Sequence, residues 1–105
     1  MSLKDRRYQL HDELKALLGS NNVYFQPPES ALLRYPCIVY TREAMNNVSA
    51  DNSKYNRRVR YNLTLIGDTP DSDLIEAILN HFPYCSYDRY FASDNLSHDA
   101  FTLYY

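Results

Sequence analysis

A chain of 105 residues, 45% of them hydrophobic, can bury one core but is too short for two independently folding domains. Its formal net charge of -2, from 11 basic and 13 acidic residues, provides no overall field that would attract nucleic acid or an anionic membrane. No apolar run approaches the roughly 20 residues that span a bilayer, and the N-terminal segment lacks the apolar stretch of a signal peptide. We therefore expect a single domain, residues 1–105, without a membrane partner.

The first predicted element is a helix over residues 3–18. Ser2 is a plausible N-cap and Gly19 a plausible stop. The residues that follow the helical period form a narrow, leucine-rich stripe: Leu3, Arg7, Leu10, Leu14, Leu17 and Leu18. This stripe suits packing on one face of a sheet.

The next predicted elements are strands. A short extended piece over residues 23–26 ends at Pro27 and Pro28. Two long strands follow, over residues 35–43 and 56–67, and a polar loop joins them. The first long strand is apolar on both faces, which indicates an inner strand. The second alternates cleanly, so its core side chains are Val59, Tyr61, Leu63 and Leu65.

The second predicted helix follows Gly67. Thr69 can cap it, Pro70 fits its first position, and Asp71 and Asp73 complement the helix dipole. Its apolar stripe runs from Leu74 to Phe82.

Two strands over residues 84–92 and 96–105, joined by a turn at residues 93–95, are predicted to complete the chain. Simple alternation places Cys85, Tyr87, Arg89 and Phe91 on one face of the first of them. The predicted fold class is α+β: a mainly antiparallel sheet with two helices packed on one face and a long β-hairpin arm.

Residue types that carry chemistry are sparse. His11, His81 and His98 lack a second ligand at zinc-site spacing, and the two cysteines form no C-x-x-C pattern. A nucleophilic pair of Cys37 or Cys85 with His98 is conceivable, but both cysteines lie in apolar segments that do not favour a thiolate. Two glycines are too few for a phosphate-binding loop. We expect no catalytic residues, no metal and no cofactor, and therefore no enzyme.

A basic and aromatic cluster in the second long strand leaves two interpretations open. Arg57, Arg58 and Arg60 lie beside Tyr55 and Tyr61, an arrangement that can stack bases and hold phosphates. Alternatively, these arginines occupy the solvent face of an amphipathic strand and reach acidic groups on a neighbouring subunit. The absence of a basic excess favours the second interpretation.

Four segments carry a likeness to a known family: YPCIVYTRE, SADNSKY, RYNLTLIGDTPDSDL and FPYCSYDRYFASDNLSHDAFTLYY. In this order and spacing, covering about residues 8–105, the chain resembles a family of small siphophage and prophage virion proteins. That family comprises tail-completion, tail-terminator and minor capsid proteins. The resemblance implies a structural protein that forms a ring, commonly a hexamer, on the tail tube and joins it to the head.

The resemblance also implies partners and a location. The partners are further copies of the chain, the tail tube protein and a head-completion or connector protein, with no nucleic acid beyond DNA that passes through the ring. The location is the tail or neck of the virion, after synthesis in the bacterial host cytoplasm. Whether the ring lies on the tail side or on the head side of the neck stays open.

A ring requires a contact that reaches the next subunit, and the polar loop with its flanking arginines is the candidate. The predicted assembly residues are Asn46, Asn47, Asp51, Asn52, Lys54, Tyr55, Arg57, Arg58 and Arg60. The alternative function is a small monomeric nucleic-acid-binding domain that uses the strand from Arg57 to Tyr61.

Overall fold

The computed structural model describes residues 2–47 and 57–105, which form two helices and one five-stranded sheet. Along the chain the elements are α1 (Leu3–Leu18), β1 (Val23–Phe25), β2 (Cys37–Asn47), β3 (Arg57–Gly67), α2 (Asp73–His81), β4 (Cys85–Ser93) and β5 (Leu96–Tyr104). The strand order in the sheet is β1-β2-β3-β5-β4. Only β1 pairs in parallel, with β2, so the predicted mainly antiparallel α+β fold is confirmed.

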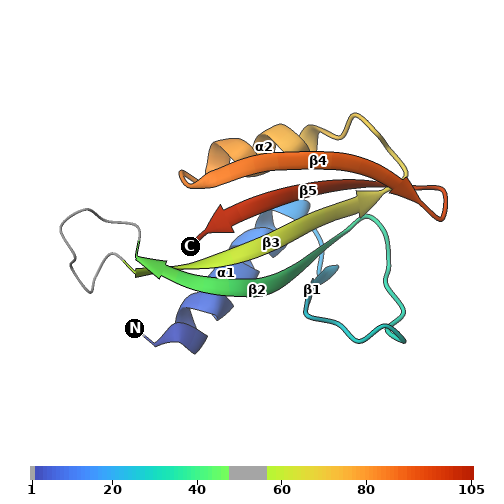
Figure 1. The fold of residues 1–105 in the computed structure, drawn as a ribbon. Coiled ribbons are helices and arrows are strands. Elements are labelled where there is room, and N and C mark those ends of the chain that lie inside the picture. The colour runs from blue at the N-terminus through green and yellow to red at the C-terminus, as the bar shows by residue number, and fades with distance from the viewer. Residues whose placement is uncertain (1, 48–56) are drawn as a thin grey trace.

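Both helices lie behind the same face of the sheet (Figure 1). Leu10 and Leu14 of α1 and Ile78 of α2 are fully or almost fully buried there, together with side chains of β2, β3 and β5. The predicted packing of two helices on one face is therefore what the structure has, and β2 is an inner strand as expected.

The alternation predicted for β3 is confirmed. Its core-facing side chains are at most 3% exposed: Val59, Tyr61, Leu63 and Leu65. The opposite sheet face, here called the open face, has no described helix over it. Along β2, β3 and β5 it carries mainly small and polar side chains, among them Val39, Thr41, Asn62, Thr64, His98, Ala100 and Thr102, together with the larger Arg60 and Ile66.

The ends of α1 follow the prediction, whereas the start of α2 does not. The Ser2 hydroxyl accepts the Asp5 amide at 3.0 Å, and Gly19 ends α1 in the left-handed region at φ 78°. The predicted cap of α2, Thr69, is wrong. Residues 70 and 71 form a turn instead, and Ser72 caps the helix by accepting the Leu74 amide at 3.2 Å.

The faces predicted for β4 are correct only for its first half. Cys85 and Tyr87 face the helices, but the register shifts between Tyr87 and Arg89. This bulge inserts one extra residue, so Arg89 and Phe91 point to the open face, and Tyr90 takes the helix side opposite Asp99. The tight turn that joins β4 to β5 has positive φ at Asp94 and Asn95, as a two-residue hairpin requires.

The hairpin of β2 and β3 is longer than predicted. Residues 45–47, assigned to the loop from the sequence, continue β2 and pair with Val59, Arg58 and Arg57. Since β5 pairs with β3 only from Arg60 onward, a short end of the hairpin extends past that neighbour. Residues 48–56 lie outside the described residues, and the long arm stays a prediction.

Replacing Leu63 by alanine tests this one-sided core. Leu63 is fully buried under the helices, so the change should lower the free energy of unfolding by about 2–5 kcal/mol. Thr64→Ala, the next residue and on the open face, is the matched control and should change it by less than about 1 kcal/mol. Urea denaturation monitored by circular dichroism measures both. Equal losses would contradict the assignment of the two faces.

A buried carboxylate lies at one end of the core-facing row of β5. Asp99 is 2% exposed and accepts a hydrogen bond of 2.7 Å from the Tyr87 hydroxyl. This hydrogen bond, with a smaller contribution from burial, raises the pKa of Tyr87 from 10.0 to about 12. Tyr87 is therefore held in its protonated form across the physiological range.

Asp99→Asn should return the pKa of Tyr87 toward 10, because the amide oxygen accepts the hydroxyl without the repulsion of a carboxylate for a phenolate. Since the folded-state pKa is the raised one, the stability that this bond contributes is complete below about pH 10 and is lost as the pH rises toward 12. NMR titration of 13C-labelled tyrosine gives the pKa, and Tyr87→Phe identifies its signal. An unchanged pKa in Asp99→Asn would contradict the proposed cause.

Candidate functional site

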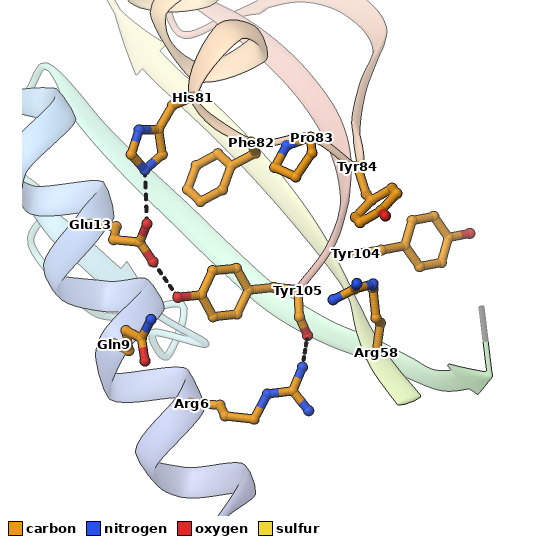
Figure 2. A pocket seen from close by; sticks show the side chains of 10 residues that line it. All are labelled: Arg6, Gln9, Glu13, Arg58, His81, Phe82, Pro83, Tyr84, Tyr104 and Tyr105. Carbon is orange, nitrogen blue, oxygen red and sulfur yellow. Dashed lines mark hydrogen bonds and ion pairs between the residues drawn. The ribbon is translucent and has the colours of Figure 1, made fainter. Parts of the chain in front are cut away.

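A groove of about 460 Å³ lies at the end of the sheet where β3 begins. Figure 2 shows its walls: Arg6, Gln9 and Glu13 of α1 on one side, residues 81–84 on the other, and Arg58, Tyr104 and Tyr105 from the strands between them. This site is called the Arg58 groove below. Its volume is in the range of ligand sites, and its walls combine aromatic rings with a few charged groups.

The two helices meet at one wall of the Arg58 groove through Glu13. His81, in the last turn of α2, donates from Nε2 to one carboxylate oxygen of Glu13 at 2.8 Å. The Tyr105 hydroxyl donates to the other oxygen of Glu13 (Figure 2). Burial, and then this contact with Glu13, raises the pKa of Tyr105 above its ordinary value. Both oxygens of Glu13 thus have donors within the protein.

Tyr105 is also held by its backbone. It exchanges two hydrogen bonds with Val59 of β3, at 3.0 and 3.2 Å, and its carbonyl oxygen accepts from Arg6 at 2.6 Å. Its ring packs edge-on against Phe82, with 6.1 Å between the ring centroids. These contacts make the floor of the groove rigid.

Arg58 lines the groove by stacking on a ring. Its guanidinium lies 4.5 Å from the centroid of Tyr84, which is 47% exposed. A stacked guanidinium still directs its N–H groups outward in its own plane, where they can meet carboxylate or phosphate oxygens. With Arg6 nearby and Glu13 already bonded to two donors, the groove favours an anionic group attached to an apolar or aromatic body.

The structure separates the predicted assembly residues. Arg58 and Arg60 lie on the same side of β3, opposite Val59 and Tyr61, but their contacts differ. Arg58 lines the Arg58 groove, whereas Arg60 Nε lies 3.2 Å from Glu43 Oε2, an ion pair outside hydrogen-bond geometry. Backbone pairing places Asn47 opposite Arg57, and Asn46 opposite Arg58, in the hairpin end. The remaining predicted residues lie outside the described residues: Asp51, Asn52, Lys54 and Tyr55.

The structure does not bring a cysteine to His98. Cys37 and His98 share the open face, but Ile66 of β3 lies between them, and Cys85 faces the helices instead. Burial raises the pKa of both thiols to about 11, with the Asp88 charge adding to the effect at Cys85, so both are protonated at neutral pH.

Within residues 2–47 and 57–105, no three His, Cys, Asp or Glu side chains are placed to hold a metal ion. Neither described helix has the length and apolar character to cross a bilayer.

Most residues of the Arg58 groove were not singled out from the sequence. Arg6, Glu13 and Tyr105 come from two separate segments, and each fits an ordinary helix or strand position by itself. His81 was considered only as a metal ligand. One signal did point to the site, the association of Arg58 with tyrosine, although its stacking partner is Tyr84 and not Tyr61.

Tyr105→Phe tests the contact that joins α1 to β5. Loss of the hydroxyl that donates to Glu13 should lower the free energy of unfolding by about 0.5–1.5 kcal/mol. Because the pKa of Tyr105 is raised in the folded state, the difference in free energy of unfolding between wild type and the variant should be full below about pH 10 and shrink at higher pH. Tyr104→Phe, whose hydroxyl points away from the groove in Figure 2, is the control for denaturation measurements. Equal effects of the two variants would contradict the role given to Glu13.

Comparisons with protein-family models, with curated proteins and with solved structures find no match to this chain.

Proposed function

We propose that this chain is a structural subunit of a bacteriophage virion, a tail-terminator or head-tail joining protein that assembles as a ring on the tail tube. The observation that carries the proposal is the likeness in the four quoted segments, which together extend over about residues 8–105. The fold that this likeness implies, a sheet flanked by helices, agrees with the α+β architecture of the chain. The proposed partners are the tail tube protein and a connector protein on the head side.

The end of the β2–β3 hairpin is the proposed contact with the next subunit or with the tube. Arg57 and Asn47 pair with each other beyond the point where β5 ends its pairing with β3. The residues that join them include Asp51 and Lys54, whose charges suit a polar contact. A ring needs two different patches on each subunit, and this end of the molecule supplies one of them.

The nucleic-acid alternative has weaker support. Tyr61 is 2% exposed in the core, so its ring is not available to stack on a base. The carboxylate of Glu43 accompanies Arg60, and it would repel a phosphate at that position. Arg58, stacked on Tyr84, keeps the combination of cation and aromatic ring that single-strand binders use.

The proposal predicts that the protein caps tail tubes assembled from the major tail protein of the same phage. Negative-stain electron microscopy should show a ring at one end of each tube. Replacing residues 48–53 by a Gly-Ser segment of equal length should leave the fold intact by circular dichroism and reduce the capped fraction. This design spares residues 45–47, which pair with β3 in the sheet.

Fluorescence anisotropy with a labelled single-stranded oligonucleotide separates the two functions. A structural ring protein should bind it weakly or not at all. Uncapped tubes, together with an oligonucleotide affinity that falls steeply with salt and weakens in Arg58→Ala, would replace the proposal by the nucleic-acid alternative.

A further inference from the structure

An acidic segment connects β3 to α2. Residues 68–73, here called the acidic turn, contain three aspartates and no basic residue: Asp68, Asp71 and Asp73. All three are exposed, as is Pro70 between them. The acidic turn thus presents carboxylates on both sides of a small apolar ring.

The acidic turn and the Arg58 groove lie at opposite ends of the sheet. Strand β3 begins beside the groove and ends at Gly67, just before the acidic turn (Figure 1). At about 3.3 Å per strand residue, the path from Arg58 to Gly67 is about 30 Å. The acidic turn therefore cannot enter the groove of its own chain.

The chemistry of the two surfaces is complementary. The groove presents the N–H edge of Arg58 and the positive field of Arg6 beside the rings of Tyr84 and Tyr104. A guanidinium binds carboxylates with directed hydrogen bonds, and aromatic walls accept a proline ring. The segment from Asp68 to Asp71 offers both kinds of group within four residues.

We propose that the acidic turn of one copy docks in the Arg58 groove of the next copy. The proposal rests on the ring assembly proposed above and specifies one of its contacts. Because the groove and the turn are different patches, the contact is heterologous, and each copy keeps a free groove or a free turn for another copy. Repetition of this contact produces a ring when the rotation between copies closes, and this is the arrangement that a tail terminator requires.

The contact should be weak and sensitive to salt when the chain is alone in solution. Exposed ion pairs contribute little individually, and ions screen them over about 10 Å at 0.1 M salt. Docking of Pro70 against Tyr84 and Tyr104 excludes water from the pair that Arg58 makes, which strengthens it. Self-association should therefore appear at high protein concentration and decline as the ionic strength rises.

Charge reversal tests the contact by sedimentation velocity over a protein concentration series at low salt. Wild type should increase in mass with concentration, whereas Arg58→Glu and Asp71→Lys should each weaken association about tenfold or more. The double variant with both changes should associate again, because its glutamate meets the lysine of the next copy. An equal mixture of the two single variants should also associate, because every contact between one variant and the other pairs a basic group with an acidic group.

Two matched controls exclude a general effect of charge. Arg89 stacks on Phe91 as Arg58 stacks on Tyr84, but it lies on β4 away from the groove, so Arg89→Glu should associate as wild type does. Glu29→Lys, at an exposed loop position, controls for Asp71→Lys. Circular dichroism checks the fold of every variant.

The proposed contact is wrong if wild type stays monomeric throughout the series, if the single reversals associate as wild type does, or if the double variant fails to recover. These outcomes leave tube capping as a separate measurement, because sedimentation is carried out without tubes. Conversely, tubes can stay uncapped while the charge-reversal variants sediment as expected. That result would contradict the proposed function and leave the contact between copies standing.

Discussion

Four side chains of β3, at every second position from Val59 to Leu65, lose nearly all contact with water because α1 and α2 pack across them. Each such burial contributes about 1.5–3 kcal/mol to stability. The neighbours of β3 in the sheet are β2 and β5. Their buried side chains on the same face lie directly opposite this row: Ile38, Tyr40, Phe101 and Leu103. The register of the sheet is therefore determined by this row, since a slip of one residue would expose it.

Packing both helices on one face has a consequence at the end of the sheet. There α1 and α2 come together through Glu13 and His81, while the strands finish in the aromatic pair Tyr104 and Tyr105. The space between these groups is the Arg58 groove. Glu13 and Arg6 are bonded within the protein there, while the guanidinium of Arg58 stacks on the exposed ring of Tyr84.

The sequence was sufficient for features that depend on local chemistry. The cap at Ser2, the stop at Gly19 and the alternation of β3 each follow from residue type and spacing, and the structure has them. The start of α2 was placed too early because Thr69 and Ser72 can both accept an amide hydrogen bond. Only the turn at residues 70 and 71 decides between them.

Features that depend on distant pairing could not be predicted. The register shift in β4 has no glycine to signal it, so strict alternation assigned Arg89 and Phe91 to the wrong face. The parallel pairing of β1 with β2 depends on how the connection of residues 26–36 folds back. The groove assembles from segments separated by up to 99 positions, as in the contact from Arg6 to Tyr105, and no local pattern marks it.

The bulge in β4 also affects the exposed edge of the sheet. β4 is an edge strand, and an edge with free N–H and C=O groups invites the same edge of another molecule to add to it. The bulge interrupts that row of groups and places the charged Asp88 and Arg89 in its middle. At the opposite edge, β1 has only three residues. The bulge of β4 and the short length of β1 each reduce the run of free backbone groups at an edge of the sheet, which lowers the tendency of other molecules to add strands there and of the sheet to grow into fibrils.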